Sequence, residues 1–165
     1  MSLLSAPTRL SAQELRRAFG AFPTGVTLVG AVIEGEPVGV LASSFTSVSL
    51  DPALVSVAFA HTSSTWPVLA TRDVLGISVL SAHQGEHVAR LSRPPRERFD
   101  TVTVGRGNHG ELMLPGAVAT FAVRPYQQVE AGDHTVAFLE VLDMRWQEDL
   151  PPLVVHRSGL HRLTT

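Results

Sequence analysis

The sequence contains no cysteine, few charged residues and no long apolar run, and each of these absences excludes a class of protein. Without cysteine the chain has no disulfide, no thiolate nucleophile and no thiolate-bound metal. No uninterrupted apolar stretch reaches the roughly 18 residues that a membrane-spanning helix needs. The first residues lack the basic region and the apolar core of a secretion signal. We therefore expect a cytoplasmic protein that does not enter a membrane.

Charged residues make up 17% of the sequence and hydrophobic residues 44%. The net charge of −2 and the isoelectric point near 6.4 give no basic surface of the kind that attracts nucleic acid. A chain of 165 residues with this composition fits one domain with a sizeable core. We expect a flexible tail over residues 1–10 and a single domain over residues 11–165.

Two capping boxes predict where helices begin. In Ser11-Ala-Gln-Glu14 and in Ser81-Ala-His-Gln84, the serine and the side chain three residues later can satisfy opposite backbone N–H groups. A short helix is also expected at Pro67, because proline suits a first helical turn. Apolar residues follow the first box at helical spacing and predict one buried face on that helix: Leu15, Ala18, Phe19 and Phe22.

β-Branched and apolar residues predict more strands than helices. Most connections between these strands are too short for the crossovers that parallel strands need. The sequence therefore predicts a mainly β protein, built as an antiparallel barrel with a few short helices. The expected strands cover residues 26–33, 38–42, 54–59, 74–80, 102–104, 117–126, 134–146 and 153–156.

Five hydroxyl side chains gather within seven residues, between two of these strands: Ser43, Ser44, Thr46, Ser47 and Ser49. Phe45 and Val48 interrupt them as apolar anchors, and Asp51-Pro52 supplies a turn directly afterwards. One interpretation of this hydroxyl segment (residues 42–49) is a ligand site, because anchored hydroxyls suit the polar edge of a flat molecule. The other is an ordinary loop, in which the hydroxyls bond their own backbone.

Gly105-Arg-Gly-Asn-His-Gly110 matches the glycine pattern of dinucleotide-binding folds and follows an expected strand. Such a site also needs a full helix directly after the glycines, whose N-terminus holds the pyrophosphate. Only Glu-Leu-Met-Leu separates Gly110 from Pro115-Gly116. We therefore expect a glycine loop between strands.

His83-Gln-Gly-Glu-His87 fits the H-x-x-E-H pattern of some zinc proteases, with both histidines on one helical face. A zinc site needs a third protein ligand, and the sequence points to none. Gly85 also weakens the helix, so we expect a capped, exposed helix start and no metal site. No serine lies in a G-x-S-x-G elbow, which argues against a serine hydrolase.

Three motifs resemble the short-chain flavin reductases, the components that supply reduced flavin to two-component monooxygenases. They are Leu41-Ala-Ser-Ser-Phe-Thr-Ser-Val-Ser-Leu-Asp-Pro52, Phe22-Pro-Thr-Gly-Val26 and Gly132-Asp-His134. The first motif is specific because of its length, whereas Gly-Asp-His alone would mean little. The resemblance extends from about residue 15 to residue 163, nearly the whole chain.

The resemblance implies a Greek-key split β-barrel of the FMN-binding type, in which a homodimer binds flavin at its interface. It also implies an NAD(P)H:flavin oxidoreductase, which passes hydride from NADH or NADPH to FMN or FAD. The reduced flavin would then diffuse to a partner monooxygenase. Two alternatives stay open: a flavoprotein that retains its flavin and acts on an organic substrate, and a flavin-binding module without turnover.

The family's flavin-binding roles carry over to three segments of this chain. One segment would line the flavin, namely Thr24, Gly25 and Val26. A second would contact the ring and the ribityl chain, namely Ala42, Ser43, Ser44 and Thr46. A third would bind the phosphate at the start of the short helix, where a plain helix cap is the alternative: Ser63, Ser64 and Thr65.

The family's nicotinamide-side motif corresponds to Gly132, Asp133 and His134, of which His134 is the expected catalytic residue. The alternative for this motif is a hairpin turn, with glycine free to take positive φ. His134 begins an expected strand, and a turn alone does not require an imidazole there.

The chain departs from the family's pattern in three places. Ser43 stands where many relatives carry asparagine, and His61 stands near a basic position of theirs. Residues 152–163 have His156 and Leu160 where aromatic side chains are usual, which leaves the choice of FMN or FAD open. The loop of Arg93, Arg96 and Arg98 is expected to be solvated rather than bound to phosphate.

Overall fold

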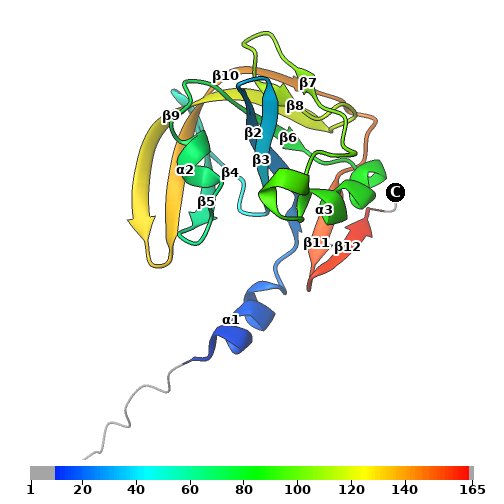
Figure 1. Ribbon diagram of the computed structural model, residues 1–165. Coiled ribbons are helices and arrows are strands. Elements are labelled where there is room, and N and C mark those ends of the chain that lie inside the picture. The colour runs from blue at the N-terminus through cyan, green and yellow to red at the C-terminus, as the bar shows by residue number, and fades with distance from the viewer. Residues whose placement is uncertain (1–9, 164–165) are drawn as a thin grey trace, which may run out of the picture.

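The computed structural model describes residues 10–163 (Figure 1). Apart from Leu10, which is exposed, the tail expected for residues 1–10 lies outside the described residues. The helices are α1 (Ala12–Phe19), α2 (Trp66–Leu69) and α3 (Gly85–Leu91), with short 3-10 segments η1 (Ala82–Gln84) and η2 (Pro95–Glu97). None of these described helices is long and apolar enough to cross a membrane.

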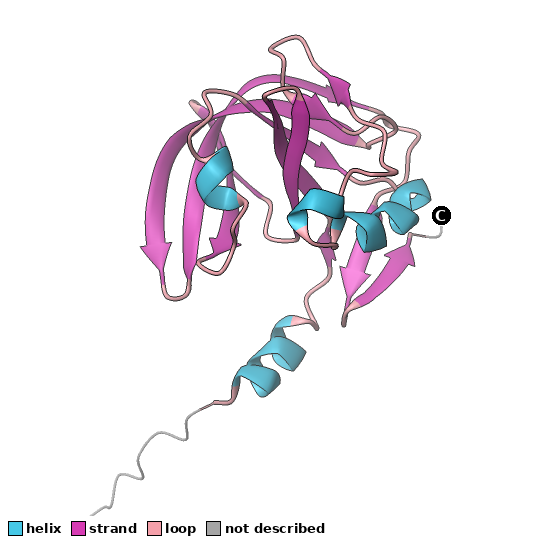
Figure 2. Cartoon of the chain, in the orientation of Figure 1, coloured by secondary structure: helices cyan, strands magenta, loops and turns pink. Residues whose placement is uncertain are grey.

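The strands form sheets of seven, three and two members, and every pairing is antiparallel. The seven-stranded sheet has the order β3-β2-β6-β9-β10-β5-β4, and β1-β11-β12 and β7-β8 form the smaller sheets. Figure 2 shows the short helices lying beside the curved strands, except for the first helix, which stands apart from them. The predicted mainly β, antiparallel fold with a few short helices is confirmed. The strands are β1 (Thr24–Gly25), β2 (Thr27–Ile33), β3 (Glu36–Ala42), β4 (Thr46–Leu50), β5 (Ala53–Ala60), β6 (Leu75–Val79), β7 (Gly105–Arg106), β8 (Leu112–Met113), β9 (Ala119–Ala131), β10 (His134–Trp146), β11 (Leu153–His156) and β12 (Gly159–Arg162).

The two edge strands of the large sheet, β3 and β4, follow one another in the chain. No ladder joins them among the described residues, so the sheet is open there, and residues 43–45 cross from one edge to the other. β4 also carries a register shift against β5 between Ser47 and Ser49. The hydroxyl segment thus spans the opening of the sheet, with its first half as the crossing and its second half as β4.

Two apolar clusters fill the interior, and β2 contributes to both. Successive side chains of a strand point to opposite faces, so Leu28 packs in one cluster and Val29 in the other. The Phe59 and Trp66 rings stack with their centroids 3.9 Å apart, which attaches α2 to the sheet. The cluster around Val29 also contains Val57, Ile77, Val123 and Leu139, and the cluster around Leu28 contains Leu80, Leu91, Leu112 and Leu153.

Helix α1 begins at the predicted capping box, in which Ser11 Oγ accepts the Glu14 N–H and Glu14 Oε2 accepts the Ser11 N–H. It contains no buried residue, and Figure 1 shows it projecting from the body of the molecule. Phe19 and Phe22 are 69% and 74% exposed. The predicted helix is confirmed, but the predicted buried face is wrong within this chain, because no other described segment covers these rings.

The remaining predictions have mixed outcomes. The second capping box is confirmed at η1, from which α3 continues, and β10 and β11 have the predicted bounds. The glycine loop is confirmed, because Gly107 and Gly110 lie between β7 and β8. The strand predicted at residues 102–104 is wrong: Val102 is buried, but no ladder includes these residues.

Candidate functional site

The crossing between β3 and β4 is held by the side chain of Ser44. Its hydroxyl accepts the Ala58 N–H at 2.9 Å and donates to the Ala58 carbonyl at 3.1 Å. Both backbone groups belong to β5, so this side chain takes the place of a neighbouring backbone. Phe45 is half-buried and stacks on Phe121 at 5.6 Å, whereas Val48 is 45% exposed. The prediction that Phe45 anchors the hydroxyl segment is therefore confirmed, and the prediction that Val48 does so is wrong.

Ser43 and Thr46 flank this anchor, and both are exposed. Within residues 10–163 the Ser43 hydroxyl makes no hydrogen bond, and the Thr46 hydroxyl makes only a long one, 3.5 Å to the Ser44 carbonyl. The Ala42 carbonyl already accepts the hydroxyl of buried Thr27 at 3.0 Å. The exposed hydroxyls of Ser43 and Thr46 are thus accessible to a ligand, as is that of Ser47, while Ser44 is used by the fold.

Strand β1 lies beside the crossing, because β2 continues from it and pairs with β3 in the register Thr27↔Ala42. On its other side β1 pairs with β11, where Thr24 is opposite Val155. Val26 is buried, and its carbonyl accepts the Leu80 N–H at 2.9 Å. Of the three flavin-lining candidates here, Thr24 and Gly25 therefore have accessible groups and Val26 serves the core.

The segment Ser63, Ser64 and Thr65 leads into α2. The Ser63 hydroxyl accepts the Trp66 N–H at 3.1 Å and so supports the start of α2, whereas the N-cap residue Thr65 makes no side-chain cap. Thr65 is buried, and its hydroxyl accepts a hydrogen bond from Nη1 of Arg98 at 2.9 Å. Ser64 is the exposed member of the three.

Arg98 is half-buried, so the prediction that it lies in a solvated loop is wrong. Its Nη1 donates to the Gly39 carbonyl at 2.7 Å, and its Nε donates to the Arg93 carbonyl at 2.9 Å. Burial lowers the pKa of this guanidinium. Within residues 10–163 it forms no ion pair with a carboxylate. A partly buried cation whose hydrogen-bond partners are all neutral is suited to bind an anion. In the sequence, only the nearby Pro94-Pro95 indicated that this loop is rigid.

Gly132 and Asp133 form the two-residue turn between β9 and β10, in which Ala131 pairs with His134. Gly132 has a φ of 66°, a left-handed value that glycine adopts without a Cβ clash. Asp133 Oδ1 lies 2.7 Å from Nδ1 of His134. This hydrogen bond, the charge of His134 and that of His61 hold the pKa of Asp133 below its ordinary value. The predicted hairpin turn is confirmed. Because the Asp133 carboxylate accepts a hydrogen bond from Nδ1 of His134, Nε2 of that ring is left to face a ligand.

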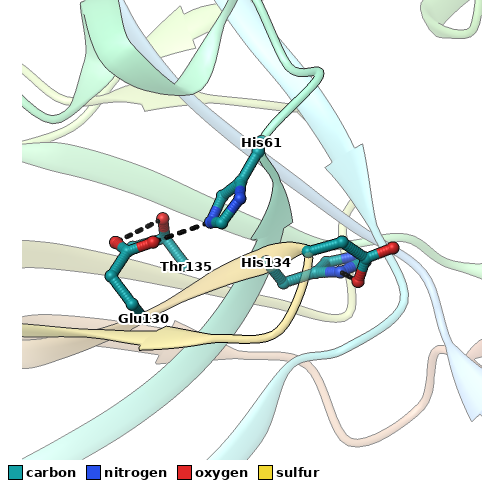
Figure 3. Close-up of polar contacts among 5 residues, drawn as sticks. His61, Glu130, His134 and Thr135 are labelled. Atoms are coloured by element: carbon teal, nitrogen blue, oxygen red, sulfur yellow. Dashed lines mark hydrogen bonds and ion pairs between the residues drawn. The ribbon is translucent and has the colours of Figure 1, made fainter.

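A second imidazole–carboxylate contact lies at the same place (Figure 3). Nε2 of His61 is 2.7 Å from Oε2 of Glu130, and the Thr135 hydroxyl donates to Oε1 of that carboxylate at 3.0 Å. The backbone N–H of His61 also donates to the backbone carbonyl of Asp133 at 2.9 Å. Glu130 could not be identified from the sequence, because only the pairing of β5, β9 and β10 brings it near His61.

Strand register brings these segments to one end of the seven-stranded sheet. Ser44 is bonded to Ala58, and two residues further along β5, Ala60 pairs with His134. Neighbouring strands lie about 4.8 Å apart, so the crossing and the hairpin, on either side of β5, are separated by about 10 Å. Figure 1 shows both on the lower side of the molecule as drawn. The four segments singled out in the sequence are therefore neighbours, and their roles stay predictions.

The two histidines of the H-x-x-E-H pattern fall in different helical segments, His83 in η1 and His87 in α3. His83 is exposed and His87 is half-buried. In the part of the chain that the structure describes, no three His, Asp or Glu side chains are placed to hold a metal ion.

The family described as flavin reductase like domain matches residues 19–164 of this chain. The chain is 38% identical over 137 residues to the reductase component of a flavin-dependent trigonelline monooxygenase from Acinetobacter baylyi. The aligned region covers 82% of this chain and 44% of that protein. It is 39% identical over 123 residues to the stachydrine N-demethylase reductase subunit Stc3 of Rhizobium meliloti. Here the aligned region covers 74% of this chain and 54% of that protein. The chain thus spans about half the length of these two relatives.

A relative of more similar length is an NADH-dependent FAD reductase from Streptomyces globisporus, 42% identical over 139 residues, with 81% of this chain and 76% of that protein covered. Among solved structures, the chain is similar to the Streptomyces globisporus NADH:FAD oxidoreductase SgcE6 in complex with NAD and FAD fragments. That similarity has a TM-score of 0.88 at 32% identity, and it covers 99% of this chain and 98% of the other.

Proposed function

The chain belongs to the flavin reductase like domain family, and from this membership we propose that it is an NADH:flavin oxidoreductase. Hydride would pass from the nicotinamide to FMN or FAD, and the reduced flavin would leave for a partner monooxygenase. The observation that carries the proposal is the family match over residues 19–164, nearly the whole chain. Relatives named as an NADH-dependent FAD reductase and as a monooxygenase reductase component support it.

The residues at the end of the sheet fit a flavin. A flavin has a polar ring edge, a ribityl chain and a phosphate, and when bound it supplies the ring that accepts the hydride. The exposed hydroxyls of Ser43 and Thr46 suit the polar edge, because each can donate and accept. The half-buried guanidinium of Arg98, with only a hydroxyl and carbonyls as partners, suits the phosphate beside Ser64 and Thr65.

The protein's own part in the reaction is to orient the nicotinamide, and we assign this role to His134. Its Nδ1 contacts Oδ1 of Asp133 at 2.7 Å, which leaves Nε2 available to the nucleotide. The turn that carries both residues is tied to β5 by the hydrogen bond from the His61 N–H to the Asp133 carbonyl. An imidazole placed in this way can hold the nucleotide at one face of the flavin without taking part in proton transfer.

We propose further that the protein is a homodimer. Phe19 and Phe22 are exposed on and after α1, and Met144 and Trp146 are exposed at the far end of β10, where Phe121 helps them line an apolar hollow of about 270 Å³. Exposed aromatic side chains of this size suit an interface with a second copy. Light scattering at micromolar concentration should give twice the chain mass of 17.7 kDa, and a single-chain mass would contradict the dimer.

Two measurements test the proposed function. An absorbance spectrum of the purified protein shows whether it retains flavin, and consumption of NADH or NADPH is then followed with added FMN or FAD. We expect turnover that depends on added flavin and is faster with NADH. A tightly held flavin without turnover of added flavin would favour a flavoprotein that acts on its own substrate.

A reaction that consumes NADH needs a compartment that regenerates it, so we keep the cytoplasm as the proposed location.

A further inference from the structure

A groove of about 660 Å³ lies between α1 and the turn that joins β11 to β12. Its polar lining comes from Gln13, Arg16 and Arg17 on the helix, and from Arg157 and Ser158 in the turn. We call it the arginine groove. None of the residues assigned to the flavin or to the nicotinamide lines it, so it is separate from the site described above.

The arginine groove concentrates positive charge without a counter-ion. No carboxylate lines it, and within residues 10–163 none of its three arginines forms an ion pair. Glu14, the acidic residue of α1, is engaged by the N–H and the hydroxyl of Ser11, and this bonding lowers its pKa. Arg16 and Arg17 lie in the last turn of α1, where cations favourably oppose the helix dipole. That explanation covers two arginines but not the third.

Arg157 occupies an unusual backbone position. It has a φ of 50° and Ser158 has a φ of 65°, so both central residues of the turn are left-handed. Such turns favour Asn, Asp and Gly. The β2–β3 turn of this chain also has a non-glycine residue first, Glu34 at a φ of 53°, but it has Gly35 where the present turn has Ser158. Side chains held in a left-handed conformation are strained, and they persist where the surroundings fix them.

The turn is fixed against the end of α1 by backbone contact. The Arg157 N–H donates to the Gly20 carbonyl at 2.8 Å. A Cβ built at Gly20 would lie 3.6 Å from the Arg157 Cα, an ordinary van der Waals distance, so the turn lies directly against the end of α1. The fold therefore holds a strained arginine beside two others at one groove.

We propose that the arginine groove binds a phosphate group of a nucleotide substrate. Guanidinium groups match phosphate oxygens bidentately, and Gln13 and Ser158 add further donors. The groove adjoins the candidate site, because β11 leads into this turn and pairs with Thr24 and Gly25 of β1. Flavins and pyridine nucleotides both carry phosphate away from the reacting ring. The concave lining of the groove fits a phosphate group better than it fits an acidic segment of another protein. The assignment of that phosphate to a nucleotide rests on the proposed function.

Binding of inorganic pyrophosphate to the purified protein tests the groove itself. Calorimetry compares the wild type with the R16Q/R17Q/R157Q variant and with the control Arg72→Gln, an exposed arginine that contacts Thr71 through its side chain. We expect binding that weakens with added salt, a loss of at least about tenfold in the triple variant, and an unchanged affinity in the control. Equal affinity in all three proteins overturns the proposal.

A second variant separates binding from folding. Arg157→Gly removes the guanidinium and relieves the left-handed strain, so we expect an equal or higher melting temperature together with weaker pyrophosphate binding. A lower melting temperature with unchanged binding would show that Arg157 serves the turn alone, and it would overturn the proposal.

Binding of NADH, NADPH, FMN and FAD, each measured separately, identifies the source of the phosphate. Loss of affinity for the pyridine nucleotides alone, or for the flavins alone, assigns the groove to that class. Loss of pyrophosphate binding with all four nucleotides unchanged means an adventitious anion only and overturns the nucleotide assignment. Failure of the proposed function is distinguishable, because the wild type would then reduce no flavin whatever the groove binds.

Discussion

The two sides of the candidate site are built from different kinds of contact. On the flavin side, Ser44 is bonded to the backbone of β5 and Arg98 to backbone carbonyls. On the nicotinamide side, His61 and His134 are held by Glu130 and Asp133 in contacts whose side chains are largely exposed. The contacts of Ser44 and Arg98 involve no group that titrates near neutral pH, whereas imidazole–carboxylate contacts weaken with salt and with loss of the imidazole proton. The difference suits a protein with one fixed side and one adjustable side.

The largest expected effect comes from breaking the adjustable side. His134→Ala should lower kcat/KM for NADH on the order of a hundredfold, because the nucleotide would lose the group that orients it. Flavin affinity should be unchanged, since the flavin side does not depend on this ring. Stopped-flow hydride transfer on flavin-saturated protein measures the loss, with exposed His109→Ala as the control. A transfer rate within about twofold of the wild type, at saturating and at limiting NADH, would remove His134 from the site.

Breaking the fixed side should act on stability instead. Ser44→Ala leaves the N–H and the carbonyl of Ala58 without their side-chain partner, which should lower the free energy of unfolding by about 1–3 kcal/mol. Ser43→Ala, one residue earlier and exposed, should change it by less than about 0.5 kcal/mol. Urea denaturation of the two variants compares them directly. Equal stabilities would show that the crossing is not held by Ser44.

A smaller effect is expected where the fixed side meets the ligand. Thr46→Val keeps the shape of the side chain and removes its hydroxyl, so flavin affinity should fall by up to about tenfold. Ser47→Ala is the matched control, because successive side chains of β4 point to opposite faces. Flavin fluorescence titration gives both dissociation constants. An unchanged affinity in Thr46→Val would return the hydroxyl segment to the interpretation of an ordinary loop.

The smallest expected effect sharpens the comparison through pH. The pKa of Asp133 is held below its ordinary value in the folded protein, chiefly by the hydrogen bond to His134. Its ionised carboxylate therefore stabilises the fold at pH values above the ordinary aspartate pKa, and this contribution is lost as the pH falls through the lowered pKa. NMR titration of the Asp133 carboxyl should show the pKa rising towards its ordinary value in His134→Ala. The same pKa in both proteins would mean that the two side chains do not interact in solution.

Much of the fold could be predicted because alternation and capping are local signals. The bounds of β10 and β11 and both capping boxes follow directly from nearby residues. Alternation, however, reports burial rather than pairing, so Val102 was assigned to a strand although it is buried without a ladder. β4 was not predicted as a strand because its residues are mostly hydroxylic, and only the neighbouring β5 makes it one.

The candidate site could be predicted only where a motif is continuous in sequence. The hydroxyl segment and Gly132-Asp133-His134 are such motifs, and register then places them at one end of the sheet. Pattern could not separate Ser44, which the fold uses, from Ser43, which is exposed, because that depends on Ala58 across the crossing. The contacts between Glu130 and His61 and between Arg98 and Thr65 also join residues far apart in the chain.

The register shift in β4 has a consequence for self-association. An edge strand with a straight row of backbone N–H and C=O groups is a template for a strand of another molecule, which leads to aggregation. β4 pairs with β5 on either side of Val48, which the ladder leaves out, and Val48 and Leu50 are 45% and 97% exposed. A bulged strand of five residues is too short and too bent to recruit a partner along its length. The same irregularity that shapes the hydroxyl segment thereby protects an apolar edge from amyloid-like growth.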